Sequence, residues 1–174
     1  LHSNEIDNLK IFDEHSIPKL ETVLRMFPDM KFQIDVKTDE VAMPALAIIQ
    51  KNNAMDRVCI ASFNSKRLNL VNNNYPDICI SMGPYEVAKM LLSSFGLYKK
   101  SILGNCLQIP IYEYGIKLVT KRFVKFIHSK GLKVCVWTIN DEKTFKYLID
   151  LGVDGIITDK PKLLFEVLDS ATNQ

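Results

Sequence analysis

The sequence predicts an α/β fold of the TIM-barrel type, made of repeated strand–helix units around a parallel sheet. Short apolar segments alternate with longer segments whose apolar residues recur at helical spacing, and this alternation runs along nearly the whole chain. The chain has 174 residues, of which 47% are hydrophobic, which is enough for one domain with a substantial core. A complete TIM barrel typically needs about 250 residues. We therefore expect residues 1–174 to form a single domain that contains only part of such a barrel.

Six strands and the helices that follow them are expected in order. The strands are predicted over residues 32–37, 57–62, 77–82, 106–109, 133–139 and 155–158. A first helix, residues 18–27, has proline at its first position and is stopped by Pro28. Later helices are expected to begin at or just after Asn64, Gly83, Thr120, Asn140 and Pro161. Asn64 and Asn140 are expected to be N-caps, since their side chains can accept hydrogen bonds from the first helical amides.

Six strand–helix units amount to three quarters of an eight-stranded barrel. A six-stranded doubly wound sheet would give the same alternation of elements, so the pattern alone leaves the closure of the sheet open. The α/β class is the general expectation, and the incomplete barrel, with six of eight strands, is the specific one.

The strand predicted over residues 32–37 carries polar residues on one face. Its apolar residues take the even positions, so Gln33, Asp35 and Lys37 point the same way. Strands covered by helices on both faces usually read as continuous apolar runs, and this strand does not. In a barrel, these side chains would line the mouth where active sites lie, with the carboxylate on a cation and the ammonium on phosphate oxygens. An edge strand with its polar face in water would show the same pattern.

Composition argues against two kinds of partner. The 22 basic and 20 acidic residues give a net charge of +2 without a basic stripe, which argues against nucleic acid. The longest apolar run, residues 41–49, is interrupted by Pro44 and is far shorter than the ~20 residues of a membrane span, so no transmembrane segment is expected. The chain begins at Leu1 rather than Met, so it gives no information on a leader, and it specifies no oligomeric state.

The chain contains four cysteines, Cys59, Cys79, Cys106 and Cys135, each in a short apolar segment and none in a CxxC pair. We expect buried, reduced thiols that act as small hydrophobic residues, with a disulfide or a zinc site as the alternative. Reduced thiols favour a cytoplasmic location, which a signal in a preceding segment would override.

Several segments, in their order and spacing, resemble the glycerophosphodiester phosphodiesterase family. Residues 17–24 (IPKLETVL) followed by residues 34–37 (IDVK) are similar to the family's IPTLEEVL and IEIK stretch. The other matches are residues 60–63 (IASF) to its SSF strand end, residues 107–110 (LQIP) to the LQIP of bacterial-type members, residues 136–140 (VWTIN) to its VWTVN, and residues 153–161 (VDGIITDKP) to its GVDGIITDxP. The resemblance covers nearly the whole chain.

The resemblance implies a metal-dependent hydrolase that cleaves glycerophosphodiesters to an alcohol and glycerol 3-phosphate, in glycerol and phospholipid metabolism. Family members hold one divalent cation, Ca²⁺ or Mg²⁺, with three carboxylates, and use two histidines as general acid and base. By position, Asp35 would be one of the metal carboxylates, where many members have Glu. Lys37 would be the phosphate-facing catalytic lysine, and Trp137 would form an apolar wall of the substrate pocket.

Within the segments that resemble the family, Ser62 and Gln108 are further candidates for substrate binding. A serine at a strand end is also well suited to bond with solvent or to cap a helix. Asn140 and Thr158 could face the same cleft, although the capping role explains Asn140 better.

The family's HRG, ExD and HD motifs, which precede the matched segments, do not occur in this sequence. The three histidines, His2, His15 and His128, lie in other contexts, so none is expected to be catalytic. One carboxylate is far short of the six or more oxygens that a hard cation binds, so the metal is expected to be weakly held. We therefore expect a fragment of a longer enzyme that lacks the N-terminal strands and is inactive by itself.

Three alternatives to the phosphodiesterase hypothesis stay open. A related barrel enzyme of phospholipase D type, acting on lysophospholipids or sphingomyelin, would share the Asp-x-Lys strand and the tryptophan. A non-catalytic binding module derived from the barrel would explain the missing histidines, but not why Asp35, Lys37 and Trp137 remain. A phosphate-binding barrel of another metabolic type would explain the GIITD segment, but not IDVK or VWTIN.

Overall fold

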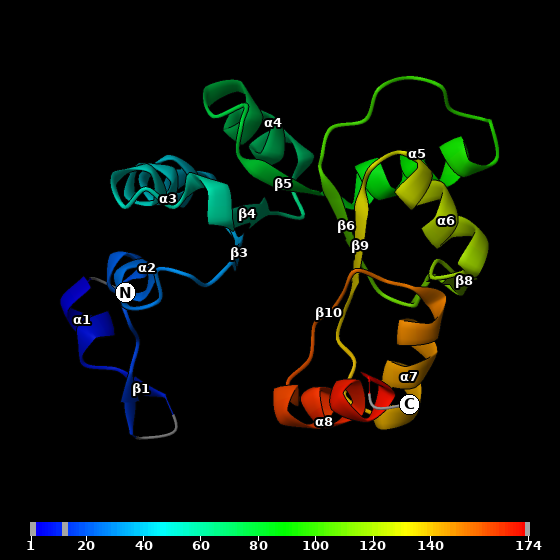
Figure 1. The fold of residues 1–174 in the computed structure, drawn as a ribbon. Coiled ribbons are helices and arrows are strands. Elements are labelled where there is room, and N and C mark those ends of the chain that lie inside the picture. The colour runs from blue at the N-terminus through cyan, green and yellow to red at the C-terminus, as the bar shows by residue number, and fades with distance from the viewer. Residues whose placement is uncertain (1–2, 12–13, 173–174) are drawn as a thin grey trace.

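The main sheet contains six parallel strands in the order β10-β9-β6-β5-β4-β3. The computed structural model describes residues 3–11 and 14–172. The strands are β3 (Phe32–Asp35), β4 (Val58–Ala61), β5 (Cys79–Met82), β6 (Cys106–Ile109), β9 (Lys133–Val136) and β10 (Gly155–Ile156). Each lies within a predicted strand, and Figure 1 shows the sheet curled with the helices along its outer side. The predicted α/β fold with six strands of a barrel is confirmed.

Helices connect the strands of the sheet. They are α2 (Leu20–Met26), α3 (Asp39–Lys51), α4 (Ser65–Asn74), α5 (Pro84–Ser94), α6 (Lys121–Ser129), α7 (Glu142–Leu151) and α8 (Pro161–Thr172), with a 3₁₀ turn at Met55–Arg57. The predicted cap at Asn64 is confirmed, because its side chain accepts hydrogen bonds from the amides of Lys66 and Arg67. The Thr120 hydroxyl accepts one from the Phe123 amide in the same way.

Two expectations about the helices were wrong, and one helix was not predicted. The N-cap of α7 is Asp141, whose carboxylate accepts a hydrogen bond from the Thr144 amide at 2.9 Å, and not Asn140. Helix α2 begins two residues after Pro18, with Lys19 as its N-cap. The helix α3 was not predicted, because Pro44 interrupts its apolar pattern. Proline has no backbone N–H, so the helix lacks one backbone hydrogen bond at this position.

The two faces of the sheet differ in composition. The residues that point outward toward the helices are aliphatic, and Ile60, Ile80, Leu107 and Val136 are at most 1% exposed. The residues between them on the inner face are polar or small, among them Gln33, Asp35, Cys59, Ser81 and Gln108. Burial of the outer residues under the helices stabilises the sheet. The inner face therefore does not have to be apolar and can carry polar side chains.

The buried residues form two clusters that divide at β5. Ile78 and Ile80 pack with the residues of β3, β4 and helices α2 to α4, such as Leu24 and Leu46. Met82, two residues later on the same strand, belongs to the other cluster, which holds β6, β9 and helices α5 to α8. The core is therefore made of two adjoining parts rather than one.

Small elements lie outside the main sheet. They are α1 (Ser3–Asp7), the hairpin of β1 (Lys10–Ile11) and β2 (His15–Ser16), and the hairpin of β7 (Tyr112–Glu113) and β8 (Ile116–Lys117). In Figure 1, α1 and the first hairpin project away from the curled sheet. None of the described helices has the length and apolar character needed to cross a bilayer.

Candidate active site

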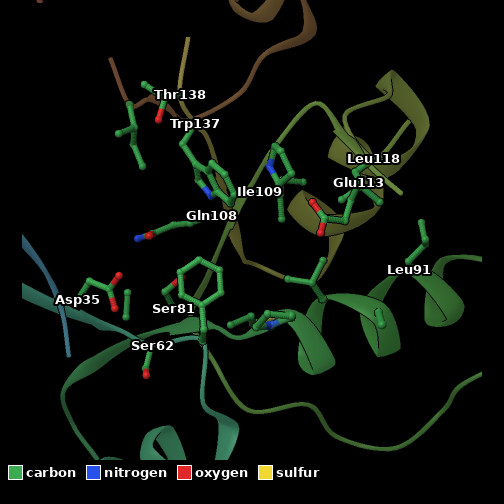
Figure 2. A pocket seen from close by; sticks show the side chains of 18 of the residues that line it. Asp35, Ser62, Ser81, Leu91, Gln108, Ile109, Glu113, Leu118, Trp137 and Thr138 are labelled. Carbon is green, nitrogen blue, oxygen red and sulfur yellow. The ribbon is translucent and has the colours of Figure 1, made fainter. Parts of the chain in front are cut away.

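A pocket of about 580 Å³ opens at the carboxyl ends of the strands, as expected for a barrel of this type. Its polar wall includes Gln33, Asp35, Ser62, Ser81 and Gln108, which come from β3 to β6 and from the turn after β4. Figure 2 shows the side chains of Asp35, Gln108 and Trp137 in this pocket. Four of the five residues predicted for the site, Asp35, Ser62, Gln108 and Trp137, line it.

The fifth predicted residue, Lys37, lies beside the pocket rather than in its wall. Its ammonium group forms an ion pair with the Asp35 carboxylate and lies 5.6 Å from the centre of the Phe63 ring. Asp35 and Phe63 both line the pocket, so Lys37 is held at its rim. The side chain of Lys37 is 71% exposed and that of Asp35 31%, which leaves both groups accessible to a ligand.

Gln108 is oriented by a neighbouring side chain from the other half of the sheet. The Gln33 amide nitrogen donates a hydrogen bond to the Gln108 amide oxygen. This leaves the amide nitrogen of Gln108 available to donate to an acceptor in the pocket. The sequence did not predict this pair, because it depends on the curvature of the sheet between β3 and β6.

Trp137 follows β9 and is placed by backbone hydrogen bonds. Its amide donates to the Ile109 carbonyl at 3.2 Å, which extends the pairing between β9 and β6 by one residue. Next to it, Asn140 connects two loops: its amide oxygen accepts from the Thr158 hydroxyl at 3.0 Å and from the Asp159 amide at 2.9 Å. Asn140 and Thr158 therefore brace the loop that carries Trp137 and are not part of the pocket wall.

The Ser62 hydroxyl forms its hydrogen bonds with other groups of the protein. It donates to the Val36 carbonyl at 3.0 Å and accepts hydrogen bonds from Arg67 at 2.9 Å and from the Asn64 amide at 3.2 Å. Figure 2 shows this oxygen pointing away from Asp35 and Gln108. Ser62 lies in the pocket wall, but these three hydrogen bonds fix the ends of β3 and β4 rather than present the hydroxyl to a ligand.

Much of the remaining wall is apolar and was not predicted. It comes from β5, β6, α5 and the segment around the β7–β8 hairpin, and it includes Met82, Val87, Leu91, Ile109, Ile116 and Leu118. Glu113 and Tyr114 of the same hairpin also line the pocket, and Tyr114 is 94% exposed. The hairpin spans only residues 112–117, and no alternating pattern marked it in the sequence.

The described histidines lie away from the pocket. His15 is exposed on the first hairpin, with its ring 3.8 Å from the Glu14 carboxylate, and His2 lies outside the described residues. His128 forms a 2.8 Å contact with Asp154, which also accepts a hydrogen bond from the Val134 amide. Burial acts to raise the pKa of Asp154, but the Val134 amide and the His128 ring together hold this pKa below its ordinary value. The pair ties α6 to the loop before β10.

The pocket can supply only part of a site for a hard cation. A Ca²⁺ or Mg²⁺ ion binds about six or more oxygens, mostly from carboxylates, carbonyls and water. Asp35 fits as one of these ligands. Within residues 3–11 and 14–172, however, three or more potential metal ligands come together only as cysteines, and no carboxylate joins Asp35 in such a group. The described residues by themselves do not make a complete Ca²⁺ or Mg²⁺ site.

Comparison with known proteins assigns the family. A model of the Glycerophosphoryl diester phosphodiesterase family matches residues 3–163. The chain belongs to this family. Among family relatives, the Mycobacterium tuberculosis protein named "Probable glycerophosphodiester phosphodiesterase 2" is 33% identical over 162 residues, which cover 88% of this chain and 60% of that protein. A human lysophospholipase D is 33% identical over 184 residues, which cover 89% of this chain and 57% of the relative.

Solved structures of glycerophosphodiester phosphodiesterases share the fold. One from Parabacteroides distasonis superposes with a TM-score of 0.77 at 21% identity, covering 98% of this chain and 72% of that one. An Oleispira antarctica phosphodiesterase, in complex with the product sn-glycerol-3-phosphate, gives 0.68 at 19% identity, covering 88% of this chain and 62% of that one. The predicted family and barrel-type fold are thus confirmed. The chain spans about 60% of the length of the curated relatives it matches.

Proposed function

We propose that the protein containing this chain hydrolyses glycerophosphodiesters to an alcohol and glycerol 3-phosphate. The observation that carries the proposal is the convergence of Asp35, Lys37, Gln108 and Trp137 around one pocket at the carboxyl ends of parallel strands. Membership of the family and the product-bound Oleispira phosphodiesterase support the same reaction class. In this reaction water adds to phosphorus, and the bond between phosphorus and the alcohol oxygen breaks.

The residues of the pocket have distinct roles in this proposal. Asp35 provides one carboxylate for a divalent cation, Ca²⁺ or Mg²⁺, which would polarise the phosphate oxygens when bound. Lys37 lies next to Asp35 and would balance the negative charge that grows on those oxygens. The amide nitrogen of Gln108 would donate to the phosphate or to a glycerol hydroxyl, and Trp137 would cover the apolar side of the substrate.

The test is release of glycerol 3-phosphate from glycerophosphocholine by the purified protein in Mg²⁺ or Ca²⁺. Removal of the lysine charge in Lys37→Met is expected to lower kcat/KM about 100-fold, by analogy with the loss of one donor to a developing anion. Asp35→Asn is expected to lower it at least as much and to raise the metal concentration needed for half-maximal rate. Matched controls are Lys31→Met and Asp29→Asn, exposed residues before β3 and outside the pocket.

Equal rates for the Asp35 and Lys37 variants and their controls would show that this pocket does not perform the reaction. A protein limited to these 174 residues is expected to release no measurable glycerol 3-phosphate. The reason is that the described pocket wall holds no histidine to act as general acid or base and too few oxygens for the cation. Metal-dependent release by that polypeptide would refute this expectation.

A second candidate substrate class, lysophospholipids, is favoured by the apolar wall. The side chains of Met82, Val87, Leu91 and Leu118 would lie in contact with an acyl chain rather than with a small alcohol. Comparing kcat/KM for glycerophosphocholine and for lysophosphatidylcholine separates the two. Leu91→Asp would place a charge in this wall, and it is expected to reduce turnover of the lysophospholipid far more than that of glycerophosphocholine. Equal loss on both substrates would remove the acyl-chain hypothesis.

The free thiols also support the proposal of a cytoplasmic location, since disulfides are rare in that compartment. The partner proposed for the pocket is a small phosphodiester, and nothing in the balanced charge of the chain favours nucleic acid.

A further inference from the structure

The inner face of the sheet carries a cysteine on each of four neighbouring strands. Cys59 lies on β4, Cys79 on β5, Cys106 on β6 and Cys135 on β9, and all four are free thiols. Inward positions of this kind of barrel are usually filled by bulky branched side chains, which build a packed interior. Thiols are small and reactive, so four cysteines on this face require a chemical explanation as well as a packing one.

Three of the four sulfur atoms come together. The Sγ atoms of Cys59, Cys79 and Cys106 all lie within 4.8 Å of one another, and those of Cys59 and Cys106 are 3.7 Å apart. In a tetrahedral zinc site, Zn–S bonds of about 2.3 Å place neighbouring sulfurs about 3.8 Å apart. The cluster therefore already has nearly the spacing that a bound zinc ion would impose.

A disulfide explains the cluster less well. Cys59 and Cys106, whose sulfurs are 3.7 Å apart, lie on strands that are separated by β5. Two strand spacings put their Cα atoms about 9 to 10 Å apart, beyond the range of roughly 4.4 to 6.8 Å that a disulfide spans. Cys59 and Cys79 are register partners on neighbouring strands, so a disulfide could join that pair, but it would leave Cys106 out. An ion that bonds each sulfur without drawing the backbones together meets no such limit.

We propose that Cys59, Cys79 and Cys106 bind one Zn²⁺ ion on the inner face of the sheet, with the fourth position open to water. This thiol site is distinct from the oxygen-ligand site proposed at Asp35, because none of the three cysteines lines that pocket. Each sulfur gives up its proton to solvent as it bonds the ion, so three thiolates and Zn²⁺ make a complex of charge −1. Thiolate ligands select zinc over Mg²⁺ and Ca²⁺, which prefer oxygen.

The surroundings are suited to such binding. Cys106 is buried, whereas Cys59 and Cys79 are half-buried, so an ion can enter from the open inner face.

The test is titration of the reduced, chelator-treated protein with Co²⁺ and Zn²⁺. One equivalent of Co²⁺ is expected to give sulfur-to-metal charge-transfer absorption that Zn²⁺ displaces and a large excess of Mg²⁺ does not. Serine at position 59, 79 or 106 (C59S, C79S, C106S) is expected to weaken Zn²⁺ binding about 100-fold, roughly one ligand's share of a structural zinc site. The matched control is Cys135→Ser, which leaves the three-sulfur cluster intact.

A second measurement does not depend on whether the variants fold. One equivalent of Zn²⁺ is expected to protect Cys59, Cys79 and Cys106 of the unmodified protein from alkylation and to leave Cys135 reactive, as peptide mapping would show. Absence of the charge-transfer band, equal protection of all four thiols, or no effect of Cys79→Ser on affinity would each overturn the proposal.

Discussion

Arg67 is expected to hold the strand end that carries the site, and replacing it by methionine tests this. Its guanidinium donates to the Val36 carbonyl at 2.8 Å and to the Ser62 hydroxyl at 2.9 Å, and its side chain is only 10% exposed. Val36 lies between Asp35 and Lys37, so Arg67 acts on the backbone that sets both side chains. A third bond, to Asp39 at 2.7 Å, involves a carboxylate that is 66% exposed and adds little.

The expected cost follows from these contacts. A hydrogen bond from a charged donor contributes about 1.5 to 3 kcal/mol. The Val36 carbonyl keeps a partner in Arg67→Met, because the Ser62 hydroxyl also donates to it, and methionine preserves most of the apolar packing. We therefore expect the two bonds to be worth less than their sum, and the free energy of unfolding to fall by about 2 to 4 kcal/mol.

Urea denaturation followed by circular dichroism measures this loss. The matched control is Lys66→Met, which removes a cation from the preceding, exposed position of α4 and should change stability by no more than about 0.5 kcal/mol. Arg67→Lys keeps the charge but cannot direct two bonds from one planar group, so it should recover only part of the loss. If Arg67→Met were as stable as Lys66→Met, the reasoning about β3 would be refuted.

Two further predictions concern stability. Gly104→Ala should cost about 2 to 4 kcal/mol, because φ is +129° and an added Cβ would lie 2.5 Å from Cγ of Met82; Gly96→Ala, with φ of +75° and open space, should cost about 1 kcal/mol in the same urea assay. Asp154→Asn should destabilise the protein at pH 7 and do so less at pH 3. The pKa of Asp154 is lowered on folding, so its contribution is present above its unfolded pKa and is lost as pH falls through its folded value. A gap between Asp154→Asn and the unmodified protein that is the same at both pH values would contradict this.

The sequence predicted structure correctly at positions where the residue type has a single clear structural role. The alternation of Gln33, Asp35 and Lys37 with aliphatic residues identified the inner face of β3, and Asn64 was recognised as a cap from its place before an apolar repeat. Asn140 and Asp141 are both good N-caps, so the sequence could not choose between them. The contact of Asn140 with Thr158 and Asp159, which decided the outcome, joins segments 18 and 19 residues apart.

Features that depend on strand register were beyond the sequence. Ser62 was expected to contact substrate, but its hydroxyl binds Val36 and Arg67, whose positions depend on how β3 pairs with β4. The Gln33–Gln108 pair and the approach of Cys59 to Cys106 both require the curl of the sheet across intervening strands. An apolar segment that contains a cysteine looks the same whether its sulfur lies alone or beside two others.

The two clusters of buried residues meet at β5, and this boundary (the seam) is where the sheet has fewer paired residues. Strand β5 is joined to β4 and to β6 by two residue pairs each, whereas β3–β4 and β6–β9 have four pairs each. Asp35 and Trp137 stand on opposite sides of the seam, so opening it would widen the mouth between them. The three clustered sulfurs come from β4, β5 and β6, so a Zn²⁺ ion bound by all three, as proposed above, would link the strands on both sides of β5. Amide exchange in β5 would then report, with and without zinc, how firmly the two halves are held together.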